Sequence, residues 1–154
     1  MTDMKLIGKN GLSRWLEIYT AVLLVLIPVL VLTLPFTITW ITDRPHGDPY
    51  YVRYLVILAY SGAMAELIFW QARRILSNVN HNRVFSADTV HRMRVMAVEC
   101  MVLAVCYLAT MFWMSKFFMA ALFVVFVLAG GVLLVFSELF RQANAYKEEN
   151  DMTI

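Results

Sequence analysis

The sequence predicts an all-α integral membrane protein with four antiparallel transmembrane helices and both termini in the cytoplasm. Three observations carry this prediction. The 154-residue chain is 61% hydrophobic and only 16% charged, and its mean hydropathy of +0.68 lies outside the range of soluble domains. Its apolar residues fall into four blocks, each long enough to cross about 30 Å of hydrocarbon as a helix. Its Lys and Arg residues gather at one end of those blocks.

The four blocks form one transmembrane domain, 1–154, and cover approximately residues 16–41, 52–72, 95–115 and 117–140. Unpaired backbone groups are costly in lipid, so each block must be helical. The first block is longer than the core of a signal peptide and has no small-residue cleavage site, so we expect it to be retained. Tryptophans and tyrosines, which prefer the headgroup layer, mark the block ends: Trp15, Trp40, Tyr50, Tyr51, Tyr54, Trp70 and Trp113.

The connections between the blocks differ in length and character. The first, "TDRPHGDPYY", is an irregular turn, and its His46 has too few neighbouring carboxylates to predict a metal site. The second, residues 73–94, is the main polar loop. Within it Ser86 is a candidate helix N-cap and Asp88 suits the first turn, so the third helix starts before the bilayer. The third is little more than Ser115 and Lys116, a tight hairpin.

Orientation follows from the distribution of the thirteen Lys and Arg residues. Ten lie in the N-terminal segment, in the loop 73–94 and in the tail 141–154. The other three, Arg44, Arg53 and Lys116, lie at the opposite ends of the blocks. The positive-inside rule therefore places the loop 73–94 and both termini in the cytoplasm.

Each predicted helix carries one glutamate in its cytoplasmic half: Glu17, Glu66, Glu99 and Glu138. Counting residues to the nearest arginines predicts that these carboxylates lie at similar depths. A carboxylate in lipid is costly unless it is protonated, paired or wet. Three interpretations remain open. The glutamates pair with arginines and join the helices at the inner face, they line a cavity open to the cytoplasm, or they form part of an ion or proton path.

Small residues indicate where helices can approach closely, within a four-helix bundle or between copies in a homo-oligomer. Gly62 lies in the second block, and Gly130 and Gly131 lie in the fourth. By contrast, the sequence contains no nucleophile with a base, no phosphate-binding glycine loop and no metal or haem motif. We therefore predict no enzymatic activity, no cofactor and no metal site.

The second half of the chain, from "ARRILSNVNHNRVFSADTVHRMRVMA" to "SELFRQANAYKEENDMTI", resembles the bacterial membrane family called domain of unknown function 2975. The loop and the start of the third helix match the family pattern at Asn82, Phe85, Thr89, Val90, Arg92, Met93 and Arg94, although asparagine is common at position 89. The C-terminal pattern is matched at Glu138, Phe140, Ala143, Tyr146, Lys147, Glu148, Glu149, Asn150, Asp151, Thr153 and Ile154. The resemblance covers roughly residues 50–154.

This resemblance implies a four-helix protein of the bacterial cytoplasmic membrane that holds or controls a small cytoplasmic helix-turn-helix regulator. An acidic tail beside an arginine-rich loop gives a surface with both negative and positive charges, which can dock such a protein by complementary charge. The candidate docking residues are Arg73, Arg74, Phe85, Arg92, Arg94, Lys147, Glu148, Glu149 and Asp151. The loop lacks a second helix or an aromatic platform for bases, so we expect no direct binding of nucleic acid.

Two alternatives stay open. One is a small transporter, channel or immunity-type protein in which Glu66, Glu99 and Glu138 surround a solute or proton site. The other is a structural subunit of a larger membrane complex.

Overall fold

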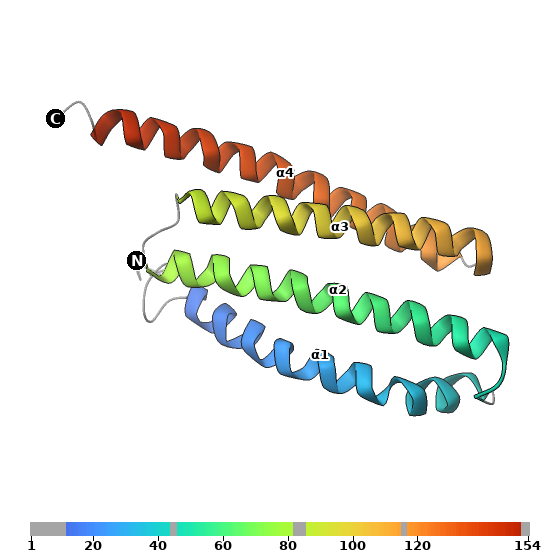
Figure 1. Ribbon diagram of the computed structural model, residues 1–154. Coiled ribbons are helices and arrows are strands. Elements are labelled where there is room, and N and C mark those ends of the chain that lie inside the picture. The colour runs from blue at the N-terminus through green and yellow to red at the C-terminus, as the bar shows by residue number, and fades with distance from the viewer. Residues whose placement is uncertain (1–11, 44–45, 82–85, 115–116, 152–154) are drawn as a thin grey trace, which may run out of the picture.

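The computed structural model describes residues 12–43, 46–81, 86–114 and 117–151, and these form four helices and no strand (Figure 1). The helices are α1 (Leu12–Thr42), α2 (Pro49–Asn80), α3 (Ala87–Met114) and α4 (Phe117–Asp151). All four are long and apolar enough to cross a membrane. The predicted all-α class and the four candidate spans are therefore confirmed.

Three of the helices extend well beyond their predicted apolar blocks. Helix α2 continues to Asn80, α3 begins at Ala87 and α4 continues to Asp151. The prediction of a loop over residues 73–94 is therefore wrong for residues 73–80, which continue α2, whereas the start of the third helix just after Ser86 is confirmed. Residues 141–151 of the predicted tail continue α4 as helix. Hydropathy detects only the part of a helix that suits lipid. The α4 segment RQANAYKEEND contains Arg, Gln, Ala, Lys and Glu, which favour helix in water as well. The end of α2 and the start of α3 contain several Asn, Ser, Thr and Val residues, and there polar contacts between the two helices stabilise the helical ends.

Local capping explains where two of the helices start. The backbone N–H of Thr89 donates to Ser86 Oγ at 3.2 Å, which confirms Ser86 as the N-cap of α3. At α2 the backbone N–H of Tyr50 donates to Asp48 Oδ1 at 2.8 Å, and Pro49 occupies the first helical position. Both caps satisfy backbone donors that have no partner within the helix.

The helices lie side by side in chain order, and the chain reverses at each connection (Figure 1). Helix α1 contacts α2, α2 contacts α3 and α3 contacts α4. Among the described residues no Cα atom of α1 lies within 8 Å of one in α4. The arrangement is therefore an open row instead of the expected bundle. Lipid tails are as apolar as leucine, so hydrophobic attraction does not force membrane helices to close.

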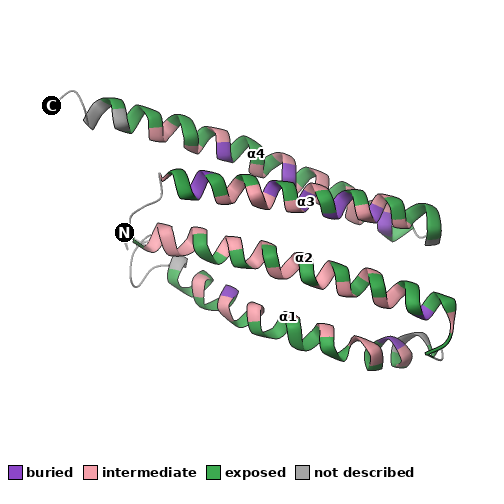
Figure 2. Cartoon of the chain, in the orientation of Figure 1, coloured by how far each residue is buried: buried purple, intermediate pink, exposed green. Residues whose placement is uncertain are grey.

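Buried residues concentrate on α3 (Figure 2). The side chains of Ala97, Leu103 and Ala104 are almost fully buried, and Leu103 forms a core with Tyr107 and with Met119 of α4. In contrast, large apolar side chains are exposed on all four helices. Such faces suit a hydrocarbon environment, in which apolar exposure has no cost.

Two of the predicted small residues lie at close helix contacts. A Cβ atom added at Gly62 of α2 would collide with Val31 of α1, and one added at Gly130 of α4 would lie 3.1 Å from the carbonyl oxygen of Ala97 in α3. At Gly131 an added Cβ atom meets nothing within 4 Å. The prediction of close packing is therefore confirmed at Gly62 and Gly130, while Gly131 lies outside the contact.

Candidate functional site at the charged end

Charged and polar side chains gather at the end of the row where α2 ends and α3 begins, which we call the charged end. The starts of α1 and α3 and the ends of α2 and α4 meet on this side (Figure 1). Polar contacts there join each helix to the next one in the row.

Helix α1 is joined to α2 by Glu17 and Asn80. The amide nitrogen Nδ2 of Asn80 donates to Glu17 Oε2 at 2.5 Å. This contact places Glu17 level with the last residue of α2. Glu66 lies fourteen residues earlier in α2, about 21 Å along the helix axis. The prediction that these carboxylates lie at similar depths is therefore wrong, because the count along the sequence ignored how the two helices are offset.

Helix α2 is joined to α3 through Thr89, whose side chain is fully buried. Asn78 Nδ2 donates to Thr89 Oγ1 at 3.2 Å and to Asp88 Oδ2 at 2.8 Å. The hydroxyl groups of Thr89 and Ser86 lie 2.9 Å apart within hydrogen-bonding geometry. The N-cap of α3 and the last turns of α2 therefore form one hydrogen-bonded unit.

Arg92 belongs to the same interface. Its Nε atom lies 2.9 Å from Asp88 Oδ2, and its Nη1 atom donates to Gln71 Oε1 of α2 at 3.0 Å. The guanidinium group is thus used between helices. Of the predicted docking residues, Arg92 is therefore held within the row by its own neighbours.

Helix α3 is joined to α4 by Arg94 and Glu138. Arg94 Nη2 lies 3.4 Å from Glu138 Oε2, and Arg141 Nη2 lies 2.5 Å from Glu138 Oε1. Gln142 also donates to this carboxylate, at 3.3 Å. Glu138 therefore contacts two arginines and joins α3 to α4, in agreement with the pairing interpretation.

Glu66 and Glu99 lie deeper in the row. In the described chain, the Oε2 atom of each is buried and has no hydrogen-bond partner. Glu66 follows Gly62 by one turn, so it lies on the side of α2 that contacts α1. Glu99 follows Arg92 by two turns, so it lies on the side of α3 that contacts α2. The four predicted glutamates are thus distributed along the row rather than gathered around one cavity.

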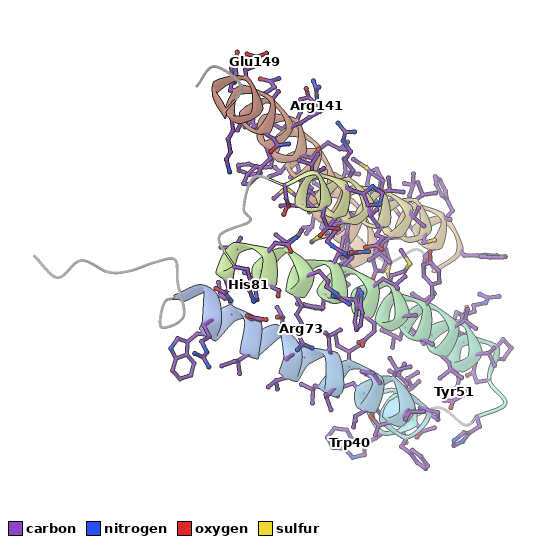
Figure 3. All side chains as sticks on the ribbon, turned by 60° about the vertical axis from the view of Figure 1, so that its left-hand side comes forward. Trp40, Tyr51, Arg73, His81, Arg141 and Glu149 are labelled. Carbon is purple, nitrogen blue, oxygen red and sulfur yellow. The ribbon has the colours of Figure 1, made fainter. Side chains whose placement is uncertain are left out.

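The remaining predicted docking residues whose side chains the structure describes are exposed. The guanidinium of Arg74 lies over the ring of Trp70, 5.3 Å from its centroid. Arg73 lines a groove beside α1 (Figure 3), and Lys147 and Glu149 are exposed on α4. Phe85 and the side chains of Glu148 and Asp151 lie outside the described residues.

Helix α4 continues past the ends of the neighbouring helices (Figure 1). We call residues 141–151 of α4 the α4 extension. Gln142, Ala145, Tyr146 and Glu149 are exposed there, and their spacing of three, one and three residues puts them on one face of the helix. Arg141 and Glu149 mark its two ends in Figure 3. One exposed face of the α4 extension therefore carries an aromatic residue near its centre, and Arg141 and Lys147 are exposed beside this face.

The comparison with known families decides the affiliation of the chain. A family model described as "Protein of unknown function (DUF2975)" matches residues 19–154. The chain belongs to this family. The match confirms the resemblance seen in the second half of the sequence and extends it through most of α1. No curated protein and no solved structure matches this DUF2975 chain.

Sequence reasoning on this DUF2975 protein missed the neutral polar residues that join the helices: Gln71, Asn78, Asn80 and Thr89. The sequence did contain one indication of a polar helix contact: Gln71 and Asn78 are seven residues apart and so share a face of α2. Their partners on α3 could not be identified without the offset between the helices. Across the described ranges there is no group of three or more His, Cys, Asp and Glu side chains suited to a metal ion.

Proposed function

We propose that this protein is a non-enzymatic multi-pass protein of the bacterial cytoplasmic membrane that binds a small cytoplasmic protein through the α4 extension. The charged end faces the cytoplasm in this proposal. Ten of thirteen Lys and Arg residues belong to that side of the chain, as the positive-inside rule requires. The partner that the family resemblance implies is a small helix-turn-helix regulator.

The single observation that carries this proposal is the helical continuation of α4 past the row. Tyr146 is 69% exposed at the centre of its outward face, flanked by Gln142 and Glu149. An exposed aromatic side chain surrounded by polar groups is a common centre of protein interfaces. Arg92 contacts α2 and Arg94 contacts α4. We therefore place the main docking contact on the α4 extension and not on the predicted loop over residues 73–94.

Binding of the purified regulator to the full chain in detergent tests this proposal. The double variant Tyr146→Ala, Glu149→Lys is expected to weaken binding by roughly tenfold or more, as loss of a central aromatic contact does. The matched control is Arg53→Glu, because Arg53 is also exposed and charged but lies near the start of α2 at the opposite end. Equal binding by the wild type and the double variant would refute docking at the extension.

The orientation has its own test. In a variant with Cys100 and Cys106 replaced by alanine, a cysteine placed at position 149 is expected to react with an impermeant maleimide only after the membrane is permeabilised. Labelling of intact cells would reverse the orientation and would remove any cytoplasmic partner from this end.

A second candidate function is a small transporter or channel, which the buried and unpartnered Oε2 atoms of Glu66 and Glu99 favour. Such atoms in a membrane often mark a path for ions or protons. Proton or solute flux into liposomes is expected to fall when Glu66, Glu99 and Glu138 are all replaced by glutamine. Unchanged flux would remove this candidate.

A further inference from the structure

Two carboxyl groups, those of Glu66 and Glu99, lie at nearly the same depth in adjacent helices. Two hydrogen bonds between side chains fix how α2 and α3 are offset: Arg92 Nη1 to Gln71 Oε1 at 3.0 Å and Tyr107 OH to Ser61 Oγ at 2.8 Å. Glu66 is halfway between the two contact residues of α2, and Glu99 is halfway, to within one residue, between those of α3. Because both helices have the same rise per residue, the two glutamates lie level with each other.

This depth falls inside the hydrocarbon region of a bilayer. Glu66 is seven residues from Arg73, about 10 Å along α2, and fifteen residues from Tyr51, about 22 Å in the other direction. Together the two distances match the hydrocarbon thickness of about 30 Å. Arginine and tyrosine are also typical of the boundaries of that region. Both carboxyl groups therefore lie about 10 Å from the nearer headgroup layer.

Neither side chain can reach that headgroup layer. A helical side chain leans toward the N-terminus of its own helix. Helix α2 begins at the end of the row opposite the charged end, so Glu66 leans away from the nearer headgroups. Helix α3 begins at the charged end, so Glu99 leans toward them, but its two methylene groups are too short to cover about 10 Å. In both residues the Oε2 atom is buried without a hydrogen-bond partner in the described chain.

The nearest arginines do not neutralise these carboxyl groups. Arg92 and Arg94 of α3 contact the polar groups described above. Arg73 shares the face of α2 with Glu66 but is exposed, and it lies two turns nearer the charged end. Within the described ranges no ion pair joins Glu66 or Glu99 to any of these three arginines.

The flanking helices bring no charge to this depth. Residues 20–40 of α1 and residues 117–137 of α4 contain no Asp, Glu, Lys, Arg or His. The thiol of Cys100, next to Glu99 in the chain, is buried and supplies no positive charge. A carboxylate without water or a counter-charge is costly in such surroundings, whereas its protonated form is tolerated.

We propose that Glu66 and Glu99 form a proton-binding pair whose two protons keep α2 packed in the row. Glu66 lies on the side of α2 that contacts α1, and Glu99 lies on the side of α3 that contacts α2. Loss of either proton therefore places a negative charge in an interface of α2, and two such charges at one depth repel each other. A rise in pH thus loosens the row. The pair requires neither docking at the α4 extension nor transport of protons across the membrane.

Infrared difference spectroscopy of the full chain in lipid bilayers at neutral pH tests the protonation. A neutral carboxyl group absorbs at a higher frequency than a carboxylate. The double variant Glu66→Gln, Glu99→Gln is expected to lose the absorption of the neutral form, and each single variant is expected to lose part of it. The matched control is Glu138→Gln, because Glu138 contacts two arginines. It is expected to lose carboxylate absorption only.

Titration with sodium dodecyl sulfate between about pH 6 and pH 8 tests the effect on stability. Unfolding exposes the two carboxyl groups, which then release their protons, so the wild type is expected to become less stable as the pH rises. One released proton raises the equilibrium constant of unfolding about tenfold per pH unit. The wild type is therefore expected to exceed the double variant in this dependence by up to about a hundredfold per pH unit.

Two results would overturn the proposal. The first is an absorption of neutral carboxyl groups that is absent from the wild type or equally strong in the double variant. The second is the same dependence of stability on pH in both proteins. The single variants keep both measurements usable if the double variant does not fold. Variants of Tyr146 and Glu149 are expected to change neither measurement, so this proposal and the docking proposal fail independently.

Discussion

Substitution of alanine for each of the two adjacent glycines of α4 tests how closely α3 and α4 approach. Gly130 and Gly131 have the same sequence context, and both lie inside a long helix. A Cβ atom at position 130 would lie 3.1 Å from the carbonyl oxygen of Ala97 and 3.1 Å from Met101 Cε, whereas a Cβ atom at 131 has open space. The two substitutions therefore differ mainly in the contacts of the new methyl group with Ala97 and Met101.

The expected magnitudes follow from two opposing contributions. Replacing glycine by alanine inside a helix stabilises it by up to about 1 kcal/mol, and this gain is common to both variants. At position 130 the new methyl group must displace a backbone carbonyl, which cannot rotate away as a side chain can. Overpacking of this kind costs about 1–3 kcal/mol. Gly130→Ala is thus expected to be less stable than Gly131→Ala by about 1–3 kcal/mol.

The free energy of unfolding of both variants is measured by titration of mixed micelles with sodium dodecyl sulfate, followed by tryptophan fluorescence. Because the helix propensity contribution cancels, the difference between the variants reports the contact directly. If the two variants are equally stable, the α3–α4 interface is not as close as described, and the reasoning fails.

Three further predictions concern the other interfaces. Thr89→Val keeps the shape of the side chain but removes the hydroxyl group that accepts a hydrogen bond from Asn78 of α2, so it is expected to lower the free energy of unfolding by about 1–3 kcal/mol. The control Thr110→Val loses only a hydrogen bond within its own helix and should be nearly neutral. Equal losses of stability in the two variants would contradict the role of Thr89. Glu66→Gln replaces a carboxylate whose buried Oε2 atom has no partner, so the variant is expected to be at least as stable as the wild type. A loss of several kcal/mol would reveal a partner for this carboxylate. Gly62→Ala is expected to destabilise the protein by about 1–3 kcal/mol, because the new methyl group collides with Val31. A simultaneous Val31→Ala substitution should restore most of this loss. If the effects of the two substitutions on the free energy of unfolding are strictly additive, the two residues do not touch.

The number and class of the elements could be predicted because each depends on local sequence. Runs of apolar residues of sufficient length must be helical in lipid, and the start of α3 was recognisable from Ser86 and Asp88. The extensions of α2 and α4 were missed for a related reason. Their residues are too polar for a hydropathy criterion. The α4 extension contains good helix formers, whereas the end of α2 is held by the contacts of Asn78 and Asn80 with the neighbouring helices.

The site could be predicted only in part, because it depends on how neighbouring helices are offset. Pairing with arginine was one of three interpretations of the glutamates, and Glu138 does pair with arginine. Glu17 instead accepts a hydrogen bond from Asn80, a neutral residue that the distribution of charges does not indicate. The choice between Gly130 and Gly131 illustrates the same limit. Both residues are equally small, and only the rotation of α4 against α3 decides which of them lies in the contact.

The open row also bears on how the protein is made. Among the described residues, helices whose Cα atoms come within 8 Å of each other are consecutive in the chain, so the main contacts do not have to wait for a distant segment to leave the ribosome. The hairpin of α1 and α2 can complete its contacts at Gly62 and Asn80 while the second hairpin is still being synthesised. Contacts of this local kind form quickly and leave few opportunities for wrong pairing. The protein can therefore be assembled in the bilayer as two successive hairpins.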